Sequence, residues 1–198
     1  ISEGAFLEGM DRIVPDKERM WEACMTFNHS WGYTPIDTDY KSAWEVLSML
    51  RQCAAGGGNL LLNIGPKPDG SLYHPCDTEL ERVGRWMKKY GKSIYEATDP
   101  IPQDWMITGA FTRKGDTLYY HCNRWPGEEL AIGGLRCKIL SAKIMGGAVL
   151  KFTQKADRLV IKGLPEKAPD VLSTPIELKF EGEARHELGP GHKLLSEV

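Results

Sequence analysis

Residues 57–66 read GGNLLLNIGP, and this stretch decides the fold. Its apolar run at residues 59–64 is short and unbroken, which is typical of a strand buried on both faces. A glycine and a proline end the run, as turn residues do. Residues 20–27, MWEACMTF, form a second run of the same kind. We therefore expect two buried strands.

Helical patterns separate and follow these two strands. Ser42 and Glu45 form a capping box, and the apolar positions behind it fall on one helical face until the glycines at 56–58 stop the helix. Thr78 and Glu81 form a second capping box, which predicts that another helix begins there. Apolar strands separated by helices indicate a parallel sheet covered on both faces. Two such units cannot bury a sheet alone, so we expect further strands upstream.

The pattern changes after a proline-containing linker at residues 99–102. Short runs follow in which apolar and polar residues alternate, as they do along residues 176–181. Residues 114–116, Lys-Gly-Asp, predict a hairpin turn before a strand at residues 117–122. Regular short strands with turn signals predict an antiparallel β-sandwich. The sequence thus predicts an α/β domain followed by an all-β domain.

Composition excludes several classes of protein. The chain has 198 residues and a formal net charge of −2, whereas a dedicated nucleic-acid binder usually carries a basic face. No run approaches the ~18 apolar residues of a membrane-spanning helix, so neither nucleic acid nor a membrane is an expected partner. The five cysteines form no CxxC pair, which argues against a zinc site or a disulfide framework. No signal peptide is visible after Ile1, so we expect either that one was removed or that the chain is a fragment.

Candidate functional residues follow both predicted strands, at the ends where an α/β barrel places its active site. Residues 29–39 combine aromatic rings with carboxylates, which is what a sugar site needs, because rings cover the apolar face of a sugar and carboxylates transfer protons. Simpler roles remain open. Asp37 and Asp39 precede a capped helix and could merely favour its dipole. Glu22 could be a structural carboxylate, and His29 could be an ordinary loop histidine.

Several motifs together resemble the α-L-fucosidases of glycoside hydrolase family 29. From about Trp21 to Tyr95 the motifs agree with the family in order and spacing. Beyond Pro100 only the predicted β-sandwich is similar. The family implies that residues 1–99 are the last βα units of a (β/α)8-like barrel and that residues 100–198 are a C-terminal β-sandwich. The matching motifs are WE at 21–22, SWGY at 30–33, DYKS at 39–42, GGNLLLNIGP at 57–66, DG at 69–70, GxW at 84–86 and YGxxIY at 90–95.

The resemblance implies a retaining exo-glycosidase that removes terminal α-L-fucose from glycans without a cofactor. Such enzymes use two carboxyl groups about 5–5.5 Å apart. No position here matches the family's nucleophile, an aspartate on an earlier strand. We therefore expect this chain to be inactive alone and to need the missing N-terminal barrel portion, from upstream residues or a second chain. The family also suggests a secreted, periplasmic or lysosomal-type location.

The family's acid/base carboxyl falls on Asp37 when the motifs are aligned without gaps, and on Asp39 with a two-residue gap. We expect Asp37 to carry the role. The substrate contacts implied by the resemblance are Trp31, Tyr33, Glu22 and His29. Met25 stands where some members carry a fucose-contacting arginine, which weakens the match on that side. Two other readings are a non-catalytic carbohydrate-binding or structural β-sandwich module, and an inactive family homologue.

Overall fold

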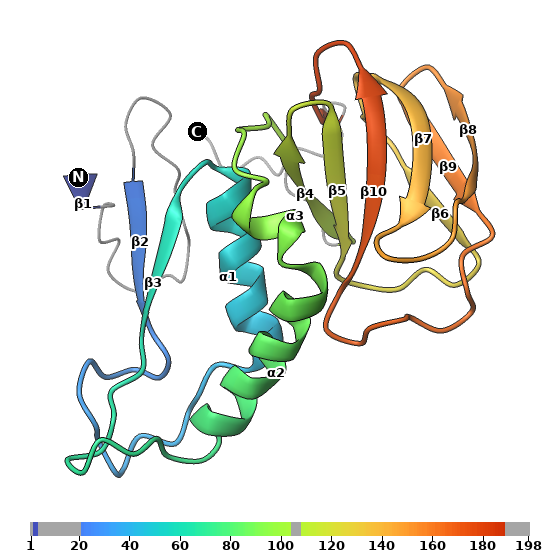
Figure 1. Ribbon diagram of the computed structural model, residues 1–198. Coiled ribbons are helices and arrows are strands. Elements are labelled where there is room, and N and C mark those ends of the chain that lie inside the picture. The colour runs from blue at the N-terminus through green and yellow to red at the C-terminus, as the bar shows by residue number, and fades with distance from the viewer. Residues whose placement is uncertain (1, 4–20, 104–107, 189–198) are drawn as a thin grey trace. The chain divides into compact units, whose positions relative to one another are not determined.

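The computed structural model describes residues 2–3, 21–103 and 108–188 (Figure 1). The chain divides into two compact units, Ile1–Thr98 and Asp99–Val198. Within the described residues, no helix is both long and apolar enough to cross a membrane. In the same ranges, no group of three or more His, Cys, Asp or Glu side chains could hold a metal ion.

The first unit contains a parallel sheet in the order β1-β2-β3, built from β1 (Ser2–Glu3), β2 (Trp21–Thr26) and β3 (Asn59–Asn63). Both pairings are parallel, which confirms the parallel arrangement predicted for the two longer strands. Met20, the first residue of the predicted strand, lies outside the described residues. The described residues of this unit also form the helices α1 (Ala43–Ala55) and α2 (Cys76–Tyr90) and the short helix α3 (Lys92–Tyr95).

One face of this sheet is open in the described structure. Cys24 of β2 pairs in register with Leu61 of β3, and both side chains are exposed. The prediction that β3 is buried on both faces is therefore wrong for this chain, because its residues are exposed or half-buried. Apolar side chains at the centre of a parallel sheet are normally covered.

Helix α1 begins as the sequence predicts. Ser42 is its N-cap, and the reciprocal capping box with Glu45 is present. The predicted second capping box is wrong, because α2 begins at Cys76 and its N-cap, Pro75, makes no side-chain capping bond. The carboxylate of Asp77 accepts the Thr78 N–H at 2.7 Å instead, so a local contact within the first turn replaces the box.

The second unit consists of two antiparallel sheets. The first has the order β4-β5-β10-β7, and the second has the order β6-β9-β8. Side chains from both sheets form one hydrophobic core, which includes Ile176, Leu178 and Phe180 on alternate positions of β10, as predicted. The strands are β4 (Gly109–Lys114), β5 (Thr117–Cys122), β6 (Glu129–Ile132), β7 (Lys138–Ile144), β8 (Lys151–Lys155), β9 (Arg158–Lys162) and β10 (Thr174–Glu181).

Candidate active site

The loop at residues 28–42 leaves the carboxyl end of β2 and is closed at its base. The Phe27 N–H donates to the Asn63 carbonyl at 2.8 Å, which extends the pairing of β2 with β3. The Lys41 N–H then donates to the Phe27 carbonyl at 2.8 Å and brings the chain back to the point where the loop began. Residues 28–40 therefore form a loop with fixed ends above the sheet edge.

Asp37 accepts hydrogen bonds from three groups of its own loop. Its Oδ2 atom accepts the His29 N–H at 2.9 Å and lies 3.4 Å from the Ser30 hydroxyl, which donates to it. Its Oδ1 atom accepts the Asp39 N–H at 3.3 Å. Asp37 is half-buried. The carboxylate therefore organises the loop in which it lies.

Asp39 is more accessible and pairs with a histidine. Its Oδ2 atom lies 2.9 Å from His29 Nε2, and the side chains of Asp39 and His29 are 83% and 72% exposed. The hydrogen bond to Asp39 raises the pKa of His29 above 6.5, and the negative charges of Asp37 and Asp39 add to the effect. The structure thus brings His29, Asp37 and Asp39 together, which the sequence did not foresee as a contact.

The two predicted sugar-facing rings lie on the same loop and remain partly open to solvent. Trp31 is 49% exposed and Tyr33 is 37% exposed. The Asn63 side-chain amide donates to the Trp31 carbonyl at 2.5 Å and so ties the backbone of this loop to the end of β3. Gly65 has a positive φ of 51°, and a Cβ atom there would lie within 3.4 Å of the Trp31–Gly32 backbone. A glycine is therefore needed where the two loops approach each other.

A group of aromatic rings joins the loop after β2 to the loop after β3. The Tyr73 ring lies 4.6 Å from Tyr40 and 6.0 Å from Tyr33, measured between ring centroids. The Tyr73 hydroxyl donates to the Ile64 carbonyl at 3.1 Å. Burial raises the pKa of Tyr73 to about 12, so the ring stays neutral at ordinary pH. Sequence reasoning assigned no role to Tyr40, although it lies within the matched DYKS motif, and none to Tyr73.

Glu22 lies apart from this loop. It is the second residue of β2 and pairs with Asn59 at the amino end of the sheet. A strand rises about 3.3 Å per residue, so Glu22 is roughly 13 Å from Thr26 at the loop end. Met25, at the position where some family members have arginine, lies closer to the loop and is half-buried. Trp31, Tyr33, His29, Asp37 and Asp39 therefore lie on one loop, within which His29, Asp37 and Asp39 are in contact, and Glu22 lies outside that loop.

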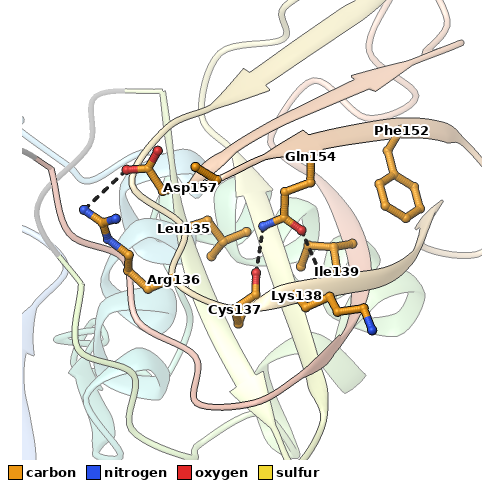
Figure 2. A pocket seen from close by; sticks show the side chains of 9 residues that line it. Leu135, Arg136, Cys137, Lys138, Ile139, Phe152, Gln154 and Asp157 are labelled. Atoms are coloured by element: carbon orange, nitrogen blue, oxygen red, sulfur yellow. Dashed lines mark hydrogen bonds and ion pairs between the residues drawn. The ribbon is translucent and has the colours of Figure 1, made fainter.

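The second unit holds a separate hollow of about 610 Å³ (Figure 2). Arg136 and Asp157 pair across 3.4 Å on one side of it, and Phe152 lies on another side. The Gln154 side chain is bonded to backbone, because it donates to the Cys137 carbonyl at 2.7 Å and accepts the Ile139 N–H at 2.9 Å. The hollow contains a single aromatic ring, and Phe152 is partly buried against the core.

Comparison with known proteins gives consistent matches. The alpha-L-fucosidase family model matches residues 2–92. The plasma alpha-L-fucosidase of Homo sapiens is 38% identical over 178 residues, which make up 82% of this chain and 38% of that protein. Alpha-L-fucosidase isoenzyme 1 from Paenibacillus thiaminolyticus superimposes with a TM-score of 0.70 at 34% identity, covering 82% of this chain and 40% of that one.

A third similar protein is the GH29 alpha-L-fucosidase from Bacteroides thetaiotaomicron, solved as a trapped covalent intermediate with 2-fluoro-fucosyl fluoride. It superimposes with a TM-score of 0.72 at 25% identity, covering 86% of this chain and 42% of that one. The chain thus spans 38–42% of the length of these three proteins. The motifs that follow β2 and β3 lie within the stretch matched by the family model. This chain belongs to the alpha-L-fucosidase family, glycoside hydrolase family 29.

Proposed function

We propose that this chain is the C-terminal part of a retaining α-L-fucosidase that removes terminal α-L-fucosyl groups from glycans. The observation that carries the proposal is the loop at residues 28–42, which places two carboxylates and two partly exposed rings together at the carboxyl end of a parallel strand. Active sites of α/β barrels lie at that end. Family membership supplies the substrate class.

The nucleophile is proposed to come from polypeptide outside this chain. The exposed pair Cys24 and Leu61 leaves one face of the sheet open, and the relatives are more than twice as long as the matched region. Upstream residues or a second chain would complete a (β/α)8-like barrel of which residues 1–99 are the last part. Residues 100–198 would be its C-terminal β-sandwich. This chain together with the polypeptide that completes its sheet would be the complete enzyme.

The proposed chemistry has two steps. In the first, the external carboxylate attacks C1 of the fucosyl group and the C1–O bond breaks, while a loop carboxylic acid gives its proton to the leaving oxygen. In the second, the loop carboxylate, which gave up its proton in the first step, takes a proton from water. The water oxygen attacks C1, and the bond between C1 and the external carboxylate breaks. Asp37 is the proposed acid/base, with Asp39 as the alternative in the same loop.

The proposed substrate contacts are Trp31, Tyr33 and His29. The apolar C–H face of a sugar can stack on a partly exposed ring, while the opposite face of the ring stays packed on the protein. Tyr33 fits this arrangement because it packs at 6.0 Å against Tyr73 and is still 37% exposed. Glu22, the fourth contact implied by the family resemblance, lies at the amino end of β2, roughly 13 Å from the end that carries the loop. A secreted, periplasmic or lysosomal-type location fits an enzyme that acts on glycans.

The test is kinetic and uses the complete enzyme with an activated aryl α-L-fucoside. Asp37→Ala is expected to lower turnover by about 10²–10⁴-fold, and azide is expected to restore part of it, because azide attacks without a general base. Thr38→Ala is the matched control, because this exposed residue lies between the two aspartates. A wild-type rate for Asp37→Ala with a large loss for Asp39→Ala would move the role to Asp39. Wild-type rates for both variants would contradict the proposal.

The alternative, a non-catalytic carbohydrate-binding module, would place sugar in the hollow between Phe152 and the Arg136–Asp157 pair. Retention of the chain on fucose-agarose, lost in Phe152→Ala and kept in Asp37→Ala, would favour that reading. The geometry favours it less, because Gln154 is already bonded to backbone and Phe152 packs on the core.

A further inference from the structure

His29 contacts both candidate carboxylates through different parts of the residue. Its backbone N–H donates to Asp37 Oδ2 at 2.9 Å, and its ring Nε2 lies 2.9 Å from Asp39 Oδ2. The two aspartates also contact each other, because the Asp39 N–H donates to Asp37 Oδ1 at 3.3 Å. The positions of the two carboxylates relative to each other therefore depend on one histidine.

We propose that His29 is a positioning residue that holds Asp39 through its charged ring while its backbone holds Asp37. The catalytic consequence rests on the proposed function, since it requires one of these aspartates to act as the acid/base. The contact itself does not rest on that function. His29 acts through the carboxylates, so it needs no contact with the reacting atoms.

The two contacts respond differently to substitution and to pH. A side-chain substitution at position 29 leaves the N–H that binds Asp37 in place, whereas it removes or changes the contact with Asp39. The ring contact also depends on charge, because the attraction between an imidazolium ring and a carboxylate is lost when the ring becomes neutral, and even the charged pair is weak at an exposed site. The contact between His29 and Asp39 is therefore the one that is lost when the ring is replaced or loses its charge.

The sign of the pH dependence follows from the charges around the ring. The hydrogen bond to Asp39 and the charges of Asp37 and Asp39 raise the pKa of His29 above 6.5, while slight burial and Lys41 act in the opposite direction. Among the described residues, the charged groups that act on this ring all belong to its own loop. The ring is therefore charged below pH 6.5 and loses its charge, and its hold on Asp39, as the pH rises through the raised pKa.

The contact is tested by NMR titration of histidine ring protons in the complete enzyme. The His29 midpoint is expected above pH 6.5 and is expected to fall towards 6.5 in Asp39→Asn. His74 is the matched control, because it is an exposed histidine whose Nδ1 lies 3.6 Å from Asp77 Oδ1 rather than beside Asp39. A His29 midpoint that is the same in the wild type and in Asp39→Asn would overturn the proposal.

The catalytic consequence is tested by the pH profile of kcat/KM for an aryl α-L-fucoside. His29→Gln keeps a hydrogen-bonding side chain without the charge. Because the Asp39 N–H also holds Asp37, the release of Asp39 disturbs both candidate carboxylates. We therefore expect His29→Gln to lower kcat on the order of tenfold and to abolish the fall in rate as His29 deprotonates. His74→Gln should leave both unchanged. A wild-type alkaline limb in His29→Gln would refute the positioning role. If the wild-type complete enzyme cleaves no fucoside, the proposed function fails, and the NMR titration still decides the contact.

Discussion

Replacing Glu79 with alanine should loosen the end of the candidate loop. Glu79 lies in α2, and its Oε2 atom accepts the Ala43 N–H at 2.6 Å, directly after the loop and at the first residue of α1. Arg82 Nη1 holds the same carboxylate at 2.8 and 2.9 Å. A side chain from α2 thus caps α1, in addition to the Ser42 capping box. The loss of Glu79 leaves the buried Ala43 without this partner.

The magnitude follows from the kind of bond. A hydrogen bond to a charged group contributes about 1.5–3 kcal/mol, and the Glu79 side chain is only 15% exposed, so solvent screens this bond little. Arg82 is 38% exposed and adds little of its own. A loss of about 2 kcal/mol corresponds to roughly 30-fold faster exchange of the Ala43 amide with solvent deuterium.

The assay is hydrogen exchange at the first turn of α1, with Glu81→Ala as the control. Glu81 is in the same helix, is 72% exposed and pairs with Arg85 at 3.5 Å, so its loss should leave Ala43 unchanged. Equal exchange at Ala43 in Glu79→Ala and the wild type would refute the reasoning. Partial burial opposes ionisation of Glu79, but the Ala43 N–H and Arg82 outweigh it and lower its pKa. The Glu79 contribution is therefore complete above pH 4.5 and is lost as the pH falls through that lowered pKa.

Other predictions concern packing and the open sheet. Gly58→Ala should lower the free energy of unfolding by about 1–3 kcal/mol in urea melts, because the new methyl group would overlap the Trp21 ring. Gly84→Ala should raise it by about 0.5–1 kcal/mol, because nothing lies within 4 Å of its Cβ position in α2. Iodoacetamide should modify exposed Cys24 in this chain and not in the complete enzyme; buried Cys53, whose pKa burial raises to about 12, is the unreactive control. Equal labelling of Cys24 in both would contradict the completed sheet.

Local patterns predicted most of the regular structure. The Ser42 capping box, the turn at residues 114–116 and the alternation along β10 all involve residues a few positions apart, and each was found. Thr78 and Glu81 show the limit of this reasoning. Their spacing satisfies the capping-box rule, yet the Asp77 carboxylate takes the Thr78 N–H and the helix begins at Cys76.

The candidate site was predicted as a set of residues but not as an arrangement. The sequence placed His29, Asp37 and Asp39 in one loop, and nothing in their spacing indicates that the histidine ring meets Asp39 while its N–H meets Asp37. The contribution of Glu79 was missed for a different reason, because it contacts Ala43 across 36 positions of sequence. Contacts of that kind depend on tertiary packing rather than on local pattern.

The most direct test of the central claim is NMR observation of the first sugar released from an aryl α-L-fucoside by the complete enzyme. Double displacement through an external carboxylate and the loop acid/base keeps the configuration at C1. We therefore expect α-L-fucose as the first product, before mutarotation. β-L-fucose as the first product would contradict this expectation, because inversion uses no covalent nucleophile.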